Sequence, residues 1–387
     1  MVQWRQYTFE KQEYDNRIER LRKKMQEQNF DLTIVTSPDN LTYLTGFQTS
    51  GYDQVQALFV PLDQDPYMVT RLLEESNVIS RTYIEKTHPF IDTDCPFEKI
   101  KEAFQKFSPL CKNVAYEKES FFLNQERHKK LADALAPLSL KDSSGLVESL
   151  RAVKTKAELE VMQIAAKVTE AGVRAAIEEV AVGKSENDVA AAAHNAMYRA
   201  GGEYPSVPPY ITSGPRTIIG HATWEGRKIE ANEPVFIEVA GCYRRYHAAM
   251  MRTVFTGKQP PQEMLEAARI VNDDIDSIMQ AMKPGITAGE VDRLARGKQD
   301  YKKIGATRFS RTGYSMGISY APSWDEGQVL SLCDGNEVEL KENMVFHLIP
   351  WMQLPKYQWV MGISETVRVT NKGAVSLFDF PRDFALL

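Results

Sequence analysis

The chain has 387 residues, 43% of them apolar and 26% charged, which is typical of a globular protein large enough for two domains. The formal net charge of −5 and the lack of a long Lys/Arg run argue against a nucleic-acid partner. No stretch approaches the roughly 18 apolar residues of a membrane span, and the start of the chain has no apolar signal-peptide core. We therefore expect no membrane partner.

The four cysteines are scattered through the chain, at Cys95, Cys111, Cys242 and Cys333, without CxxC or Cys/His spacing. Free thiols are usual in proteins of a reducing compartment, so the pattern predicts a cytoplasmic location. It also predicts no zinc site built from cysteine.

The first 150 residues alternate between amphipathic helices and short apolar strands. Helices are predicted over residues 10–28, 97–107 and 124–136, and strands over 31–37, 57–62, 67–71 and 113–117. This alternation predicts an α/β domain over residues 1–150. Arg71 closes one of its strands and is a candidate to bind the acid group of a substrate, although such an arginine is more often only solvated. No strand is followed by a Gly-rich phosphate loop, which excludes a nucleotide-binding interpretation of this half.

Residues 151–387 form the predicted second domain and contain an internal repeat. Residues 165–193 and 267–294 both have a helix, a Gly-containing turn and a second helix, with Ser185 or Thr287 as the cap of that second helix. Strand-rich sequence follows each copy. The repeat predicts a pseudo-symmetric α+β domain in which a curved sheet has helices on its outer face. A site on the concave face would then take residues from both copies.

The most informative stretch is residues 234–257, which is predicted to form a β-hairpin with strands over about 235–240 and 246–255. Glu238 lies in the middle of the first, apolar strand. A carboxylate is costly to bury there unless another group pairs with it. The second strand offers Arg245, Tyr246 and His247, so a satisfied structural glutamate is the alternative to a functional one.

Beyond these patterns, the chain resembles the pita-bread hydrolases, the superfamily of aminopeptidase P, prolidase and creatinase. The resemblance rests on the helix Arg151-x-x-Lys154…Glu158…Met162…Ala165, on the doubled halves and on the final strand at 365–373. It implies a pita-bread catalytic domain, a pseudo-symmetric curved antiparallel sheet with outer helices, preceded by an α/β creatinase-type N-terminal domain. It also implies a homodimer in which the N-terminal domain of the partner lies near the active site.

Peptidases of this superfamily carry a two-metal site on two Asp, one His and two Glu. The Arg-Thr pair at Arg252 aligns the two Asp positions with Glu238 and Ala249. The Gly-His and Glu-Pro-Gly motifs of the peptidases align the His position with Tyr314 and the first Glu position with Ile349, and Glu365 lies at or beside the last position. Two divalent ions need several oxygen or imidazole ligands, and alanine and isoleucine supply none. We therefore expect no catalytic metal and no other cofactor.

Loss of the metal ligands leaves a metal-free hydrolase or a non-catalytic binding protein. Creatinase is the metal-free precedent, because it splits a C–N bond at a guanidinium carbon. Several short segments also resemble the ectoine hydrolases, which open the cyclic amidine of ectoine without metal. These segments are residues 207–210, 221–224, 238–242, 245–247, 313–318, 321–324, 346–347, 363–365 and 379–382. The N-terminal domain lacks the aromatic and Gly-rich stretch expected around Arg71, which leaves the substrate open.

The function predicted first is metal-independent hydrolysis of a C–N bond in a small zwitterionic amidine, guanidine or cyclic amide. The alternatives are a Xaa-Pro aminopeptidase or dipeptidase with a degenerate metal site, and a binding protein on the same fold. The candidate catalytic residues are Glu238 and Glu365 toward the amidinium, His221 or His247 as general acid or base, and Tyr314 toward the tetrahedral intermediate. The candidate substrate-binding residues are Arg71, Tyr210, Trp224, Arg252 and His347. His347 also fits a core position.

Overall fold

The computed structural model describes residues 4–297 and 299–387. The chain divides into two compact units, one ending at Arg151 and the other beginning at Ala152. None of the helices in the described ranges combines the length and apolar content that a membrane crossing needs.

The N-terminal unit is an α/β domain built on a six-stranded mixed sheet. Its strand order is β4-β3-β2-β1-β5-β6, with β1 antiparallel to β2 and parallel to β5. The strands are β1 Leu32–Val35, β2 Ala57–Pro61, β3 Tyr67–Val69, β4 Lys86–Thr87, β5 Val114–Tyr116 and β6 Lys141–Asp142. The helices are α1 Lys11–Glu27, α2 Pro38–Thr45, α3 Leu72–Arg81, α4 Pro96–Phe107, α5 Gln125–Ala134 and α6 Leu146–Arg151. The predicted α/β class of this half is confirmed.

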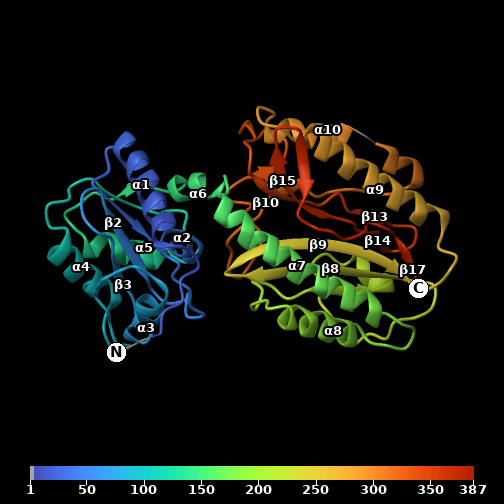
Figure 1. Ribbon diagram of the computed structural model, residues 1–387, viewed down its shortest axis with the longest axis horizontal. Helices are drawn as coiled ribbons and strands as arrows, with labels where there is room; N and C mark the ends of the chain where they lie inside the picture. Colours follow the sequence, from blue (N-terminus) through green and yellow to red (C-terminus); the bar gives the residue numbers. More distant parts are fainter. Residues whose placement is uncertain (1–3, 298) are drawn as a thin grey trace. The chain divides into compact units, whose positions relative to one another are not determined.

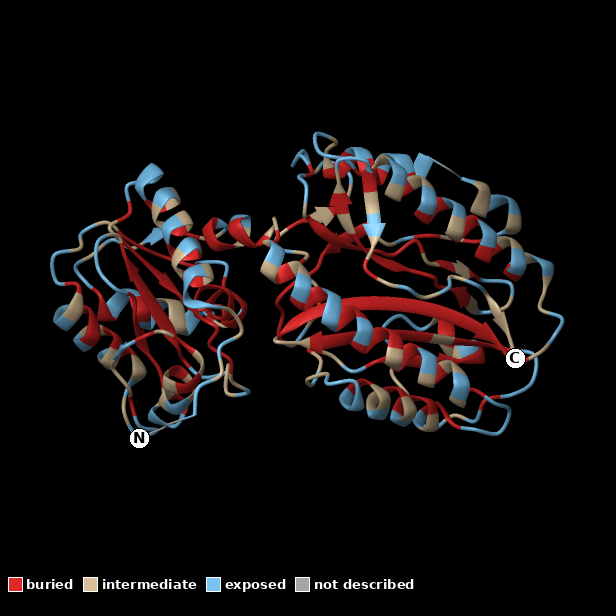
Figure 2. Ribbon diagram, in the orientation of Figure 1, coloured by how far each residue is buried: buried red, intermediate tan, exposed pale blue. Residues whose placement is uncertain are grey.

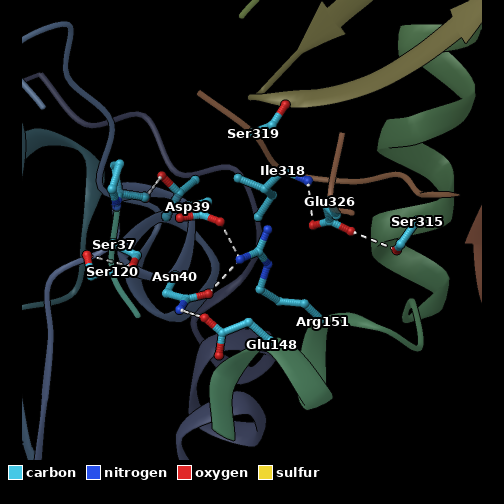
Figure 3. Close-up of polar contacts among 12 residues, drawn as sticks. Ser37, Asp39, Asn40, Ser120, Glu148, Arg151, Ser315, Ile318, Ser319 and Glu326 are labelled. Carbon is cyan, nitrogen blue, oxygen red and sulfur yellow. Dashed lines mark hydrogen bonds and ion pairs between the residues drawn. The ribbon is translucent and has the colours of Figure 1, made fainter. Parts of the chain in front are cut away.

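Buried polar side chains tie the last helix of this unit to α2. Arg151 donates to the Asp39 carboxylate and to the Asn40 side-chain oxygen, and the Asn40 amide donates in turn to Glu148 (Figure 3). Because each charge has a partner of opposite sign or a hydrogen bond, we assign the cluster a structural role.

The C-terminal unit has two halves of similar make-up (Figure 1). The first half comprises α7 Lys156–Glu179, α8 Glu186–Arg199, β7 Tyr210–Ser213, the 3₁₀ helix η1 Gly214–Ile218, β8 Pro234–Tyr243 and β9 Tyr246–Phe255. These strands form a sheet of order β17-β9-β8-β7, in which β17 is Ala385–Leu386. The predicted hairpin is thus β8 and β9, which are buried along almost their whole length (Figure 2).

The second half repeats the pattern. Its helices are α9 Gln262–Ala281, α10 Ala288–Gly297 and the 3₁₀ helix η2 Asp300–Ile304. Its main sheet has the order β11-β10-β12-β15-β16, and β13 pairs with β14 separately. The strands are β10 Gly313–Ser315, β11 Ser331–Leu332, β12 Val345–Leu348, β13 Met352–Leu354, β14 Trp359–Met361, β15 Glu365–Thr370 and β16 Gly373–Ser376. The predicted α+β pita-bread class is confirmed.

Local chemistry explains why the helices begin where they do. The Ser185 side chain and Asp188 cap the start of α8 reciprocally, and Thr287 and Glu290 exchange the same two hydrogen bonds at the start of α10. Helix α7 ends at Glu179. Strand β14 ends at Met361 and β15 begins at Glu365, and at Gly362 between them a Cβ atom would lie 2.4 Å from the Phe236 ring.

The two sheets of the C-terminal unit meet where β9 passes the segment that leads into β15. Side-chain hydroxyls make most of the polar contacts there, and we call Thr253, Ser364 and Thr366 the hydroxyl seam. The Met251 N–H donates to Ser364 Oγ at 2.6 Å, and Thr366 Oγ1 bonds both the N–H and the carbonyl of Ala249. Thr253 Oγ1 likewise donates to the Gly362 carbonyl and accepts from the Gly362 N–H. The seam fixes the spacing of the two sheets.

Candidate active site

A cavity of about 530 Å³ lies in the C-terminal unit, and both halves contribute to its walls. The first half supplies residues of β7, β8 and the loop that follows η1, and the second half supplies β10 and neighbouring loops. The aromatic lining residues are Tyr210, Phe236, Phe309, Tyr314, Trp324 and Trp351. The charged or titratable lining residues other than tyrosine are His221, Glu238, Arg311 and Asp325. A largely apolar cavity with a few converging polar groups is the usual form of a small-molecule site.

Glu238 is the central acidic group of this cavity. It lies in the middle of β8, opposite Tyr210 on β7 and Met251 on β9, and only 6% of the residue is exposed. Among the described residues, none donates a hydrogen bond to its carboxylate or forms an ion pair with it. Burial alone raises the pKa of Glu238 to about 8. At neutral pH the carboxyl is therefore mostly protonated until a cation comes close to it.

Glu326, a second buried glutamate of the same unit, differs from Glu238 in its hydrogen-bond partners. Glu326 is also buried, but its carboxylate accepts from Lys154 Nζ at 2.7 Å. It accepts in addition from Ser315 Oγ and from the Ile318 N–H (Figure 3). Glu326 thus has a cationic partner, whereas Glu238 has no counter-charge within the described part of the chain. A buried carboxylate without a partner is costly, which favours a ligand as its partner.

Aromatic rings line the same cavity as Glu238. Tyr210 packs edge-to-face against Trp324 with ring centroids 5.2 Å apart, and the His221 ring lies 5.3 Å from the Tyr210 ring. Burial, and next the neighbouring Glu238, raise the pKa of Tyr210 to about 12, so this phenol stays neutral. Aromatic faces carry negative potential and attract organic cations. A carboxyl group and aromatic rings in one cavity are chemically suited to a delocalised cation.

A buried hydrogen-bond chain runs from the cavity wall into the second sheet. Tyr314, on β10, accepts from Trp324 Nε1 at 3.1 Å, and its hydroxyl lies 2.8 Å from His347 Nδ1. The other ring nitrogen of His347 lies 2.6 Å from Ser364 Oγ. Burial raises the pKa of Tyr314 well above its usual value and lowers the pKa of His347 to about 3. Tyr314 is thus a neutral phenol in the wall, and the neutral His347 lies behind it.

A guanidinium group lies on the same wall. The Arg311 guanidinium stacks over the Tyr314 ring at 4.5 Å, and it donates to Ser331 Oγ and to the Asp325 carboxylate. Both Arg311 and Asp325 line the cavity. This pair therefore offers a donor for the acid group of a zwitterionic ligand, at a place other than Glu238.

Two predicted polar residues, Glu365 and Arg252, pair with each other and do not line the cavity. Arg252 Nη2 donates to Glu365 Oε1 at 2.8 Å, and both side chains are buried. Glu365 also accepts from Ser376, and the rest of the Arg252 guanidinium donates to backbone carbonyls of Met251, Ser364 and Pro381. These contacts hold both residues in the fold.

Other predicted residues also lie outside the cavity lining. His247 is buried, with Nδ1 near Arg245 O and Ser319 Oγ and with Nε2 accepting from the Ser206 N–H. Burial, and next the charge of Arg245, lower its pKa well below the usual value. The Trp224 ring packs against His194 of α8. Of the predicted residues, the structure brings together His221, Tyr210, Glu238 and Tyr314.

Arg71 belongs to the N-terminal unit. It precedes α3 and forms a two-pronged ion pair with Asp92, with distances of 2.8 and 2.9 Å. Its proposed contact with a substrate stays a prediction.

Sequence reasoning missed several lining residues, most importantly Trp324, Asp325 and Arg311. Trp324 ends a segment that carries the resemblance to ectoine hydrolases, and an aromatic residue in such a segment was the available signal. Arg311 lies two residues before β10, and nothing in the pattern of charges distinguishes it from solvated arginines.

The residues at the metal positions of the superfamily do not fit a two-metal centre. Glu238, Tyr314 and Ile349 line the cavity, whereas Ala249 contributes only a methyl group and Glu365 is paired with Arg252. Within the described ranges, no group of three or more His, Cys, Asp or Glu side chains is placed to hold an ion. One unpaired carboxyl and one phenol do not supply the bridging ligands that two divalent ions need.

Comparisons with known proteins agree with this architecture. The sequence matches the Creatinase/Prolidase N-terminal domain over residues 17–153 and the Metallopeptidase family M24 over residues 160–371. A hydrolase/peptidase of Sinorhizobium fredii is 31% identical over 391 residues, covering 98% of both chains. The ectoine hydrolase of Halomonas elongata is 27% identical, covering 97% of both chains, and the Xaa-Pro dipeptidase of Pyrococcus furiosus is 27% identical, covering 95% of this chain and 99% of its own.

Among solved structures, the prolidase of Pyrococcus horikoshii superposes with a TM-score of 0.83 at 22% identity, covering 95% of this chain and 99% of its own. At this identity the likeness shows the fold. Together with the match over more than half of the sequence, it shows that the chain belongs to the M24 family and has a creatinase-type N-terminal domain.

Proposed function

We propose that this protein is a metal-independent hydrolase that splits a C–N bond in a small cationic or zwitterionic amidine, guanidine or cyclic amide. The observation that carries the proposal is Glu238, a buried carboxyl group in a cavity with aromatic walls, for which the described residues supply no partner. An amidinium or guanidinium ion supplies the missing positive charge and two N–H donors in the plane of a carboxylate. The ligand is then the counter-ion of the site.

The reaction proposed is the addition of water to the carbon between the two nitrogens. An amidinium ion and one water molecule give an amide and an ammonium group: the C–O bond forms, the C–N bond breaks, and both protons of the water end on the leaving nitrogen. Glu238 binds the amidinium and acts either as the base for water or as the nucleophile. Tyr314 donates a hydrogen bond to the tetrahedral intermediate, and His221 is the candidate acid for the leaving nitrogen.

The ends of the ligand are assigned by charge. Glu238 and the rings around it take the cationic end, and Arg311 takes a carboxylate at the other end. Glu365 and Arg252 act in this proposal through the fold, because they pair with each other away from the cavity lining. The cytoplasmic location and the homodimer expected from the sequence remain parts of the proposal.

The relatives support two readings of the chemistry. The ectoine hydrolase of Halomonas elongata fits the proposal, and the Xaa-Pro dipeptidase of Pyrococcus furiosus fits the alternative of a metallopeptidase. The mismatch between the donor set and a two-metal centre favours the first reading. A binding protein without turnover is the third possibility.

The test is incubation of the purified full-length protein with ectoine, creatine and a Xaa-Pro dipeptide, each with EDTA or with added Mn²⁺, with products identified by mass spectrometry. Turnover of an amidine or guanidine in EDTA supports the proposal, and Glu238→Gln should abolish it. Glu337→Gln, which changes an exposed glutamate, is the matched control and should have no effect. Cleavage of the dipeptide only with Mn²⁺ would establish the peptidase reading, and binding of ectoine without turnover would refute catalysis.

A further inference from the structure

The buried chain behind Tyr314 determines which way its hydroxyl proton points. Two of its donors cannot reverse their roles. Trp324 Nε1–H donates to the Tyr314 oxygen, and the Met251 backbone N–H donates to Ser364 Oγ. Between these fixed ends lies His347, with Nδ1 at 2.8 Å from the Tyr314 oxygen and Nε2 at 2.6 Å from Ser364 Oγ.

His347 is fully buried and stays neutral, because burial lowers its pKa to about 3. A neutral imidazole carries a single ring proton, so one of its nitrogens donates and the other accepts. Only two arrangements of the chain are then possible. Either Tyr314 donates to Nδ1 and Nε2–H donates to Ser364, or Ser364 donates to Nε2 and Nδ1–H donates to Tyr314.

The two arrangements differ in which hydroxyl hydrogen has no acceptor within the chain of hydrogen bonds. In the first, the hydroxyl hydrogen of Ser364 has no acceptor among the described residues, although Ser364 is fully buried. In the second, the hydrogen left over belongs to Tyr314, whose side chain lines the cavity. An unpaired buried donor is costly, whereas a donor that faces a cavity can bond to water or a ligand.

We infer that Ser364 holds His347 in the Nδ1–H tautomer, and that this tautomer makes Tyr314 a hydrogen-bond donor directed into the cavity beside Glu238. His347 is then a positioning residue that acts through Tyr314, in place of the direct contact with substrate predicted from the sequence. Both of its nitrogens are occupied, so it is not available as a general base. The inference rests on the proposed function only for the identity of the group that accepts the Tyr314 proton.

The test is direct observation of the tautomer by NMR. Protein labelled with ¹⁵N in the rings of its six histidines is recorded with two-bond ¹H–¹⁵N correlations, and His347→Gln identifies the signals of His347. We expect the Nδ1–H pattern, unchanged from pH 5 to pH 9. An Nε2–H pattern or an imidazolium pattern at pH 6 would overturn the inference, whatever the enzymatic activity proves to be.

Tyr314→Phe makes the test sharper. Without the phenol oxygen, Nδ1–H loses its acceptor, so His347 should change to the Nε2–H form and donate to Ser364. If Tyr314 were instead the donor to Nδ1, this variant would leave the tautomer unchanged. Tyr210→Phe is the matched control, because Tyr210 lines the same cavity and forms no hydrogen bond with His347.

The result for the tautomer is independent of turnover. An Nδ1–H tautomer in a protein without amidine hydrolysis would refute the proposed function and leave this inference standing. If hydrolysis is found, His347→Gln should lower kcat at least tenfold and leave KM within about twofold, since the residue supports a bond made in the transition state. An unchanged kcat would overturn the positioning role.

Discussion

Replacing Glu238 by Gln tests whether the carboxyl group lies in the cavity without a counter-charge. Glutamine keeps the size and hydrogen-bonding shape of the protonated acid but does not ionise. Because burial raises the pKa of Glu238 in the folded protein from 4.5 to about 8, the folded state holds the proton more tightly than the unfolded state does. The contribution of this group to stability is therefore complete below about pH 4.5 and is lost as the pH rises to about 8.

The size of the effect follows from the same two values. A difference of pKa from 4.5 to about 8, at roughly 1.4 kcal/mol per unit, gives an upper bound of about 5 kcal/mol. Glu238→Gln should thus change the free energy of unfolding little at pH 4.5 and raise it relative to the natural protein by up to that amount at pH 9. The gain should grow steadily between these limits.

The assay is urea unfolding followed by tryptophan fluorescence at several pH values. Four of the five tryptophans lie in the C-terminal unit, so the signal reports mainly on the unit that contains Glu238. Glu365→Gln is the control with the opposite sign. It leaves the buried Arg252 without its partner and should destabilise the protein by about 3–5 kcal/mol at pH 7. The reasoning about Glu238 would be refuted if the free energy of unfolding of Glu238→Gln were lower than that of the natural protein, or if the difference between the two stayed constant from pH 4.5 to pH 9.

Three further outcomes are expected. Lys154→Met should lower the free energy of unfolding by about 3–5 kcal/mol, because it leaves the buried Glu326 carboxylate without its cation, and adding Glu326→Gln should recover part of the loss in the same urea assay. Gly241→Ala should lower the free energy of unfolding by about 1–3 kcal/mol, since its methyl group would lie 2.5 Å from the Ala165 carbonyl oxygen of α7. A urea unfolding midpoint equal to that of the natural protein would contradict this close packing. Binding of an amidinium ligand at pH 7 should release about 0.9 proton, because a carboxyl with a pKa of about 8 is mostly protonated before binding. Calorimetry in two buffers of different ionisation enthalpy measures this release, and it should vanish in Glu238→Gln.

Periodicity and local chemistry were sufficient to predict much of the fold. The hairpin appears as β8 and β9, and Ser185 and Thr287 cap helices as expected. These features depend on residues close together in the sequence. The close approach of Phe236 to Gly362, between β14 and β15, could not be predicted in this way, because the two residues lie far apart along the chain.

The site could be predicted only in part for a similar reason. Glu238 drew attention because a carboxylate in an apolar strand is costly wherever that strand lies. Whether such a group is neutralised depends on partners that the sequence does not reveal. Arg252 lies 113 positions from Glu365 and pairs with it, whereas none of the residues that the structure describes pairs with Glu238. Likewise, Trp324 rather than Trp224 faces the cavity, because the two rings lie in different layers of the unit.

The hydroxyl seam has a consequence for the width of the cavity. Glu238 and Tyr314 stand on different sheets, and Thr253, Ser364 and Thr366 make most of the hydrogen bonds where those sheets meet. A continuous backbone ladder would fix that spacing for every sequence that adopts the fold. Here side-chain hydroxyls make most of these bonds, beside one backbone bond from the Ser364 N–H to the Met251 carbonyl. The seam therefore makes the distance between the two walls of the cavity depend on three side chains, and substituting them would act on that distance without removing a backbone bond inside either sheet.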